Sequence, residues 1–256
     1  MPRNGFPVED PRRNKLLAAL PDTEWRRLQW KFEPIEMPFG KILSDSGSPL
    51  RHVYFPTTST ISLLYAAANG ASTEIAAVGN EGLVGVALFM GGETMPGRAV
   101  VQMPGWAYRL RRDILKEEFG RGGALQRVLL LYTQVRLTLI AQTAFCNRHH
   151  SIDQQLIRWL LLTLERIISE EVIVTHELIA NILGVRREGI TEAAGKLQSL
   201  GLIASGRGRI TVVDRPGLEA HCCECYGVVR REYDRLLGSG LSYPAKHHVL
   251  SICGQN

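Results

Sequence analysis

Charged side chains gather at the start of an expected helix in the stretch GVRREGITEAAGKL, residues 184–197. Arg186, Arg187 and Glu188 stand together there. An arginine guanidinium donates two parallel hydrogen bonds to a matched pair of acceptors, and a carboxylate accepts from amino groups. A surface helix also carries such charges simply to remain solvated. Which explanation holds depends on whether neighbouring elements fix the direction of these side chains.

The residues around this stretch meet the requirements of a helix-turn-helix. Thr175 can cap a first helix, HELIANIL, and Ala180 is the small residue needed where two helices cross closely. Gly184 follows four positions later, where a tight turn requires a residue that tolerates positive φ. The expected inward face of the second helix is formed by Val185, Ile190, Ala193 and Leu197. An ordinary αα-hairpin is the alternative.

A helix-turn-helix would give the outward charges a chemical use. Its second helix enters the DNA major groove with its N-terminal residues against base edges, where arginine pairs with guanine and glutamate accepts from cytosine. The following segment, LIASGRGRITVVD, predicts a small hairpin or wing whose arginines can contact phosphates. Residues 149–214 carry a net charge of −1, but residues 184–209 carry +3, so the basic character is local. The side chains predicted to contact DNA are Thr175, His176, Arg186, Arg187, Glu188, Thr191, Glu192, Lys196, Arg207 and Arg209.

The region before this motif divides into a β-rich part and a long helix. From Pro34 to Arg112, short apolar or β-branched runs recur about every ten residues with Gly, Pro or Asn between them, which predicts a barrel or jelly roll. Short covering helices are expected in front of it. After residue 124 neither Gly nor Pro interrupts the chain until Cys146.

Apolar residues in this long helix follow a heptad spacing that predicts a dimerisation seam. The expected seam is Leu125, Val128, Tyr132, Val135, Leu139, Gln142 and Cys146. A helix packed on its own β-rich domain is the alternative, and further apolar residues at Leu129, Leu131 and Ile140 fit both arrangements. Cys146 is also placed to pair with its counterpart across a two-fold axis.

The β-rich region, the long helix and the segment VTHELIANILGVRREGITEAAGKLQSLGLIASGRGRITVVD together resemble regulators of the cyclic-AMP receptor/Fnr (Crp/Fnr) superfamily. The resemblance implies an α+β fold: an N-terminal cyclic-nucleotide-binding-like β-roll (a double-stranded jelly roll), a long dimerisation helix and a C-terminal winged helix-turn-helix. The expected bounds are 1–118 for the sensor β-roll, 119–148 for the dimerisation helix, 149–237 for the DNA-binding domain and 238–256 for a tail. The implied function is transcriptional regulation by a homodimer that binds a palindromic operator in double-stranded DNA, with RNA polymerase as a further partner.

The same resemblance assigns roles within the second helix. Recognition helices of the superfamily begin with a Ser-Arg-Glu-Thr type motif, and its base-reading Arg and Glu fall on Arg187 and Glu188. Two positions depart from the pattern. Arg186 replaces the capping serine and is a poor N-cap, and Glu192 replaces a second base-reading arginine. We therefore expect an operator different from that of the cyclic-AMP receptor.

A cyclic nucleotide is not the expected effector. Members of the superfamily that bind one use a Gly-Glu pair and an Arg-Ser/Thr-Ala run. In this chain Val86 follows Gly85 in place of the ribose-binding glutamate, and Arg98 precedes Ala99 without the Ser or Thr. Valine cannot hydrogen-bond a ribose, so these four residues form a weak effector-binding prediction, and the effector is unknown or absent.

Composition and cysteine usage bound the remaining classes. Hydrophobic content of 45% with 21% charged residues is ordinary for a soluble protein. Gln134 and Arg136 interrupt the longest apolar stretch, and the N-terminus has no apolar core of a secretory signal, so we expect a cytoplasmic protein without a membrane partner. Five cysteines, three of them clustered, do not suggest a disulfide framework.

Metal binding and catalysis are both weakly supported by the sequence. The segment HCCEC, residues 221–225, contains zinc-binding residue types, but its spacing is unusual, and on one helix its side chains would point in several directions. We therefore expect no metal and no cofactor, and treat His149 and His150 as a polar hinge. A metalloenzyme built on the β-roll would need several ligands, and between Pro34 and Arg112 the sequence has only His52. The competing function is an effector-binding β-roll protein, for a cyclic nucleotide or for metal or redox sensing, whose helix-turn-helix contacts other proteins.

Overall fold

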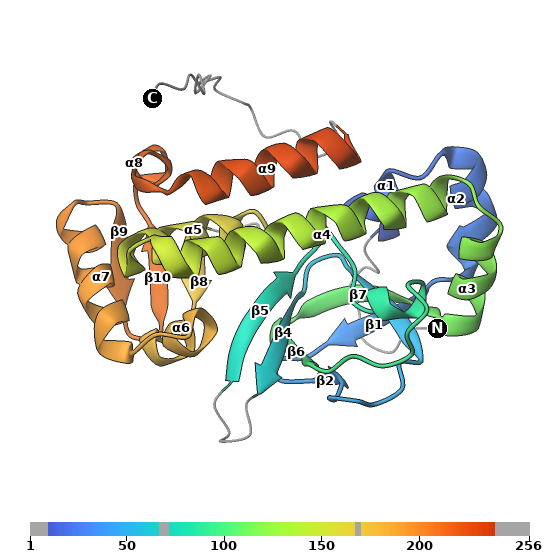
Figure 1. Ribbon diagram of the computed structural model, residues 1–256, viewed down its shortest axis with the longest axis horizontal. Helices are drawn as coiled ribbons and strands as arrows, with labels where there is room; N and C mark the ends of the chain where they lie inside the picture. The colour runs from blue at the N-terminus through green and yellow to red at the C-terminus, as the bar shows by residue number, and fades with distance from the viewer. Residues whose placement is uncertain (1–9, 67–71, 167–169, 239–256) are drawn as a thin grey trace, which may run out of the picture.

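Two antiparallel sheets form the N-terminal half of the protein, in a computed structural model that describes residues 10–66, 72–166 and 170–238 (Figure 1). One sheet has the strand order β1-β7-β3 and the other β2-β6-β4-β5. The bounds are β1 Glu33–Met37, β2 Ile42–Ser44, β3 His52–Pro56, β4 Thr60–Ala66, β5 Ser72–Val78, β6 Arg98–Met103 and β7 Gly105–Arg111. The expected β-roll is therefore confirmed.

Alternating side chains build the interior of the roll. In β3, Val53 and Phe55 are fully buried, while Tyr54 between them is half-buried. Ile61 in β4 and Val101 in β6 are also fully buried. Because successive side chains of a strand point to opposite faces, this alternation turns one face of each sheet toward a shared core.

Short helices cover the end of the roll near the N-terminus. Their bounds are η1 Pro11–Arg13, α1 Lys15–Ala18, α2 Asp22–Leu28, η2 Gln29–Lys31, η3 Val86–Leu88 and α3 Arg112–Gly120. The buried side chain of Asn14 accepts from the N–H groups of Leu16 and Leu17 and donates to the carbonyls of Pro56 and Gly82. One amide therefore caps α1 and fastens it to the roll.

The long helix α4, Ala124–His149, links the roll to the C-terminal module (Figure 1). It begins at Ala124 rather than at residue 119, because Gly122 and Gly123 adopt positive φ and separate it from α3. Glu24 of α2 accepts hydrogen bonds from the N–H groups of Ala124 and Leu125. This carboxylate satisfies two donors that a helix start otherwise leaves without a partner.

The prediction that this seam of α4 faces a second copy of the chain is wrong. Within the chain, six of its seven residues are buried: those at the start of α4 pack on the roll and its covering helices, Leu139 and Cys146 pack on the C-terminal elements, and Gln142 is half-buried. The buried members are Leu125, Val128, Tyr132, Val135, Leu139 and Cys146. The heptad spacing therefore reflects packing within the chain: on the roll in the first half of the helix, as the alternative arrangement expected, and on the C-terminal module in the second half.

A second stripe on α4 repeats the same spacing and is exposed. It consists of Leu130, Gln134, Leu137, Ala141 and Ala144, and Leu137 is 63% exposed. By length and mean hydropathy, α4 is also the one helix among the described residues that could cross a membrane, a property that core helices of soluble proteins share. The buried face of α4 packs against the rest of the chain, so the exposed stripe is the face of this helix that a partner could cover.

The C-terminal module is a small helical domain with a three-stranded sheet of order β8-β10-β9. Its elements are α5 Ile152–Leu164, β8 Glu171–Ile173, α6 His176–Leu183, α7 Arg187–Ser199, β9 Ile203–Gly206, β10 Arg209–Val212 and α8 Arg215–His221. Ser151 and Gln154 form a capping box at the start of α5. The last helix, α9 Glu224–Leu237, returns along α4 (Figure 1).

Candidate nucleic-acid interface

The turn between α6 and α7 has the geometry predicted from the sequence. The Thr175 hydroxyl accepts from the N–H of Leu178, 3.2 Å away, and caps α6. Gly184 ends the helix with φ of +68°, and the N–H of Val185 donates to the Ala180 carbonyl at 3.0 Å. A left-handed residue at this position closes the helix and redirects the chain, which is why glycine is favoured there.

Buried residues hold α7 so that its charged side faces solvent. Ile190, Ala193, Ala194 and Leu197 are each no more than 2% exposed and belong to the core of the module. The side chain of Arg186 makes no capping hydrogen bond to the first turn of α7. The DNA-contact residues predicted on this helix and its cap are all exposed: Arg186, Arg187, Glu188, Thr191, Glu192 and Lys196.

His176 connects the two helices and the wing instead of pointing freely outward. Its Nδ1 lies 3.1 Å from the Thr191 hydroxyl, and its Nε2 lies 3.1 Å from the Ser205 hydroxyl. The Thr191 hydroxyl donates to the Arg187 carbonyl, so it accepts from His176. The amide oxygen of Gln198 also accepts from the Ser205 backbone N–H. Ser205 and Gln198 therefore connect the wing to α6 and α7, and no periodic pattern in the sequence identified either residue.

Two predicted DNA contacts are paired within the module. The ammonium group of Lys196 pairs with the Asp153 carboxylate of α5, and that hydrogen bond raises the pKa of Lys196. Arg209 in β10 lies 3.6 Å from the Glu171 carboxylate of β8, with 60% of its side chain exposed. Arg207 is exposed at the turn between β9 and β10, as expected for the tip of a wing.

The four residues of the weak effector prediction do not converge. Arg98 donates from Nε to the Asp45 carboxylate at 2.9 Å, and both side chains are half exposed. Ala99 is buried in the roll core. Gly85 has φ of +111° before η3, where an added Cβ would lie 3.0 Å from Val53. Val86 packs against the neighbouring core cluster.

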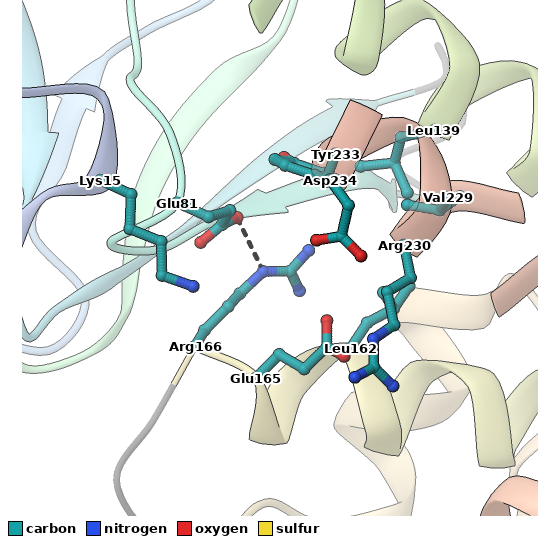
Figure 2. Close-up of a pocket in the computed structure, with 10 residues that line it drawn as sticks. All are labelled: Lys15, Glu81, Leu139, Leu162, Glu165, Arg166, Val229, Arg230, Tyr233 and Asp234. Carbon is teal, nitrogen blue, oxygen red and sulfur yellow. Dashed lines mark hydrogen bonds and ion pairs between the residues drawn. The ribbon is translucent and has the colours of Figure 1, made fainter. Parts of the chain in front are cut away.

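A small charged cavity lies where the roll, α5 and α9 meet (Figure 2). Its volume of about 40 Å³ accommodates a water molecule or two, far less than the hundreds of Å³ of typical ligand pockets. Arg166 at the end of α5 is buried and donates from Nε to Glu81 of the roll at 2.9 Å. Figure 2 shows the carboxyl groups of Glu165 and Asp234 turned toward the same guanidinium.

The cavity therefore ties the C-terminal module to the roll through charge. The Gly79 N–H also donates to Glu81, and burial lowers the pKa of the nearby Lys15 against the attraction of Glu81. Burial raises the pKa of Glu165, which accepts from the Tyr226 hydroxyl at 2.6 Å. The sequence indicated none of these partners, because they are far apart along the chain: 85 residues separate Glu81 from Arg166, and 61 separate Glu165 from Tyr226.

Comparison with known families shows which known domain the C-terminal module resembles. Residues 154–221 match the Crp-like helix-turn-helix domain. The match contains α6, the Gly184 turn, α7 and the wing, so the structural frame and the matched domain coincide. No curated protein matches the chain significantly in sequence.

Solved structures share the arrangement of roll, long helix and Crp-like domain. A putative transcriptional regulator of the Crp/Fnr family from Eubacterium rectale superposes with a TM-score of 0.64 at 17% identity, covering 82% of this chain and 98% of that one. FixK2 from Bradyrhizobium japonicum gives 0.63 at 16%, covering 75% and 98%. The c-di-GMP responsive global regulator CLP from Xanthomonas campestris gives 0.60 at 15%, covering 74% and 97%. The resemblance to Crp/Fnr regulators that the sequence indicated is therefore confirmed for the fold and for the Crp-like domain.

Proposed function

We propose that this protein is a sequence-specific DNA-binding transcriptional regulator of the Crp/Fnr type that binds a palindromic operator as a homodimer. The observation that carries the proposal is the exposure of Arg186, Arg187 and Glu188 on the first turn of α7, within a Crp-like domain whose Gly184 turn and buried face fix their direction. Such a helix enters the major groove by its N-terminal end.

The contacts of each side chain divide the interface into readers and positioning residues. We assign base reading to Arg187 and Glu188, and phosphate contacts to Thr175, Arg186 and the wing arginines. His176, Thr191 and Lys196 already bind other parts of the module, so their role in this proposal is to hold α7 and the wing in register. Glu192 is exposed one turn after Glu188, and in this proposal its carboxylate restricts which operator sequences α7 can bind.

The exposed stripe of α4 is the surface we assign to the homodimer. Leu130 and Leu137 are 47% and 63% exposed, and small residues at Ala141 and Ala144 continue the stripe toward the Crp-like domain. Their alternating spacing of three and four residues fits pairing of two helices. A dimer built here would present two α7 helices to half-sites about 34 Å apart.

The effector acts, in this proposal, by changing how the roll holds the Crp-like domain. The two parts meet where Thr73 of β5 approaches Gly184, and where Glu81 binds Arg166. A ligand that binds one arrangement better than another would shift the population of DNA-competent molecules. The effector is not assigned to a cyclic nucleotide, because Val86 and Arg98 do not form the expected binding set. The proposal places the regulator in the cytoplasm with RNA polymerase as a partner, and it includes no catalytic step.

The proposal is tested by selecting bound fragments from genomic DNA and titrating the best fragment at several salt concentrations. Arg187→Ala is expected to lower specific affinity by about 1–3 kcal/mol at one base pair and to spare non-specific binding. Arg207→Ala should weaken binding to all sequences and reduce the salt slope by about one. Arg26→Ala is the matched control, since Arg26 is exposed on α2 outside the Crp-like domain.

Two outcomes would contradict the proposal. If no fragment forms a specific complex that weakens with salt, the helix-turn-helix serves another partner, such as a protein. If Arg187→Ala reduces affinity for every sequence equally, Arg187 is a phosphate contact and not a base reader.

A further inference from the structure

Three cysteines and a histidine from distant parts of the sequence meet where α4 joins the Crp-like domain. The thiols of Cys146, Cys223 and Cys225 and a ring nitrogen of His150 all lie within 4.8 Å of one another. The cysteines are buried and His150 is half-buried. Four sulfur and nitrogen donors that converge in a protected place are the donor set of a structural zinc site.

The backbone explains why these donors converge although HCCEC has an unusual spacing. Cys146 lies in the last turn of α4 and His150 is the residue that ends this helix, and the His150 N–H donates to the Cys146 carbonyl at 3.0 Å, so the two residues stay one turn apart. The segment HCCEC is not one helix: α8 ends at His221, and Cys222 and Cys223 are extended before α9 begins at Glu224. This break removes the expectation that the thiols point in several directions.

Two distances within the cluster match those between ligands around one tetrahedral ion. Cys146 Sγ lies 3.7 Å from Cys223 Sγ, and Cys225 Sγ lies 3.6 Å from His150 Nδ1. With zinc–sulfur bonds of about 2.3 Å and zinc–nitrogen bonds of about 2.0–2.1 Å, a tetrahedron separates two sulfurs by about 3.8 Å and a sulfur from a nitrogen by about 3.5 Å. An iron–sulfur cluster spreads its protein ligands farther apart, because they bind different iron atoms.

The histidine has the outer contact that metal-ligating histidines use. His150 Nε2 lies 3.3 Å from the Glu224 carboxylate, while Nδ1 faces the thiols. A carboxylate that accepts from the outer N–H fixes the tautomer and the orientation of such a ring. Glu224 directly follows Cys223, so one short segment supplies two donors and this support.

The charge around the cluster favours an anionic centre. Arg158 of α5 is 4% exposed and donates to the Thr143 hydroxyl at 3.2 Å, but its Nε has no hydrogen-bond partner among the described residues. Thr143 precedes Cys146 by three residues on α4, which places this guanidinium beside the cluster. Zinc bound by three thiolates and a neutral imidazole carries one net negative charge. Such a centre would compensate a buried guanidinium that is costly alone.

We propose that Cys146, His150, Cys223 and Cys225 bind one Zn²⁺ ion that fastens the start of α9 to the end of α4. Binding replaces the three thiol protons with coordination bonds from three thiolates and His150 Nδ1, and no oxidation state changes. The ion lies beside the His150–Ser151 junction, so it would also fix the direction in which the Crp-like domain leaves α4.

The full-length protein tests the site directly. The protein is purified under reducing conditions, stripped with a chelator and titrated with Co²⁺ and then with Zn²⁺. We expect one ion per chain, thiolate-to-cobalt charge-transfer absorption, the strong visible bands of tetrahedral Co²⁺, and their loss when Zn²⁺ displaces it. Zinc should also raise the thermal unfolding midpoint. A chain that binds no ion, or a cobalt spectrum without thiolate absorption, would overturn the proposal, whether or not the protein binds DNA.

Neighbouring residues supply matched controls for the ligands. Cys225→Ser and His150→Gln should abolish stoichiometric binding, while Cys222→Ser and His149→Gln, which change the adjacent cysteine and histidine outside the cluster, should preserve it. Glu224→Gln should weaken zinc affinity about 10- to 100-fold through loss of the outer contact. Equal loss of the ion in the Cys222 and Cys225 variants would reject this ligand set. If a ligand variant does not fold, the stoichiometry and cobalt spectrum of the unmodified protein still decide the question.

Discussion

Replacing Glu81 with glutamine is expected to destabilise the protein by about 3 kcal/mol, because it leaves the charge of Arg166 buried without its main partner. Arg166 and Glu81 are only 8% and 11% exposed at their side chains, and 2.9 Å separates Nε from the carboxylate oxygen. The pair joins the end of α5 to the loop that follows β5 of the roll. Its loss therefore weakens the contact between the roll and the Crp-like domain.

The expected magnitude follows from the surroundings of the guanidinium. Removing one partner of a buried ion pair costs about 3–5 kcal/mol. Glu165 and Asp234 also face Arg166 (Figure 2), and their attraction keeps the loss near the lower limit. Asp113→Asn is the matched control, since Asp113 pairs with Arg111 while both side chains are more than half exposed. An exposed pair of this kind contributes little to stability, because solvent screens the two charges.

Urea unfolding of both variants measures this difference through the midpoint and the m-value. Glu81→Gln combined with Arg166→Met should recover much of the lost stability, because removing both charges leaves no buried ion without a partner. The reasoning is refuted if Glu81→Gln costs no more than Asp113→Asn. It is also refuted if the effects of Glu81→Gln and Arg166→Met simply add in the double variant.

Three further predictions concern the dimer, the interface and a buried carboxyl group. Leu137→Glu should give a monomer in analytical ultracentrifugation, because it places a charge in the exposed α4 stripe. Leu200→Glu changes a comparably exposed leucine outside α4 and should leave the oligomeric state unchanged. If the Leu137→Glu protein keeps its oligomeric state, this stripe is not the dimer surface. His176→Ala should lower the free energy of unfolding in urea by about 1–2 kcal/mol and weaken binding to operator DNA, since it removes contacts to Thr191 and Ser205. Glu177→Ala, at an exposed residue of the same helix, should do neither. Equal losses of stability and DNA affinity in the two variants would reject the positioning role of His176. Burial raises the pKa of Glu74 against the hydrogen bond from Ser62, so the folded state retains this proton to higher pH than the unfolded chain. The stability that this proton confers is complete below the ordinary pKa of 4.5 and is lost as pH rises through the raised value. Glu74→Gln should remove this loss, and parallel pH profiles of urea midpoints for the two proteins would disprove it.

Local patterns in the sequence were sufficient where one short segment contains all the interacting residues. The Gly184 turn, the Thr175 cap and the buried face of α7 lie within 23 residues, and their backbone preferences and periodicity fix how the two helices cross. The β-roll was predictable for a similar reason, because each strand carries its own alternation. The missing cap at Arg186 could also be foreseen, since an arginine side chain is a poor acceptor for the first N–H groups of a helix.

Periodicity identified α4 as a packed helix but could not show which partner covers each face. Both its seams repeat every three and four residues, and burial on the chain's own roll and α9 distinguishes the one containing Tyr132 from the one containing Leu137. The partners of His176 also could not be predicted from the sequence. Its residue type suits a phosphate contact, yet folding brings Thr191 and Ser205 to its two ring nitrogens.

Sequence alone determined the Crp-like frame and the residues that this frame turns outward, because turn conformation and helical periodicity are local properties. Tertiary structure decided what covers α4, which charges join the roll to the Crp-like domain, and how Cys146 and His150 meet Cys223 and Cys225 across more than 70 residues of chain. Distances between groups so far apart in sequence depend on the packing of whole elements. No spacing within a single segment encodes them.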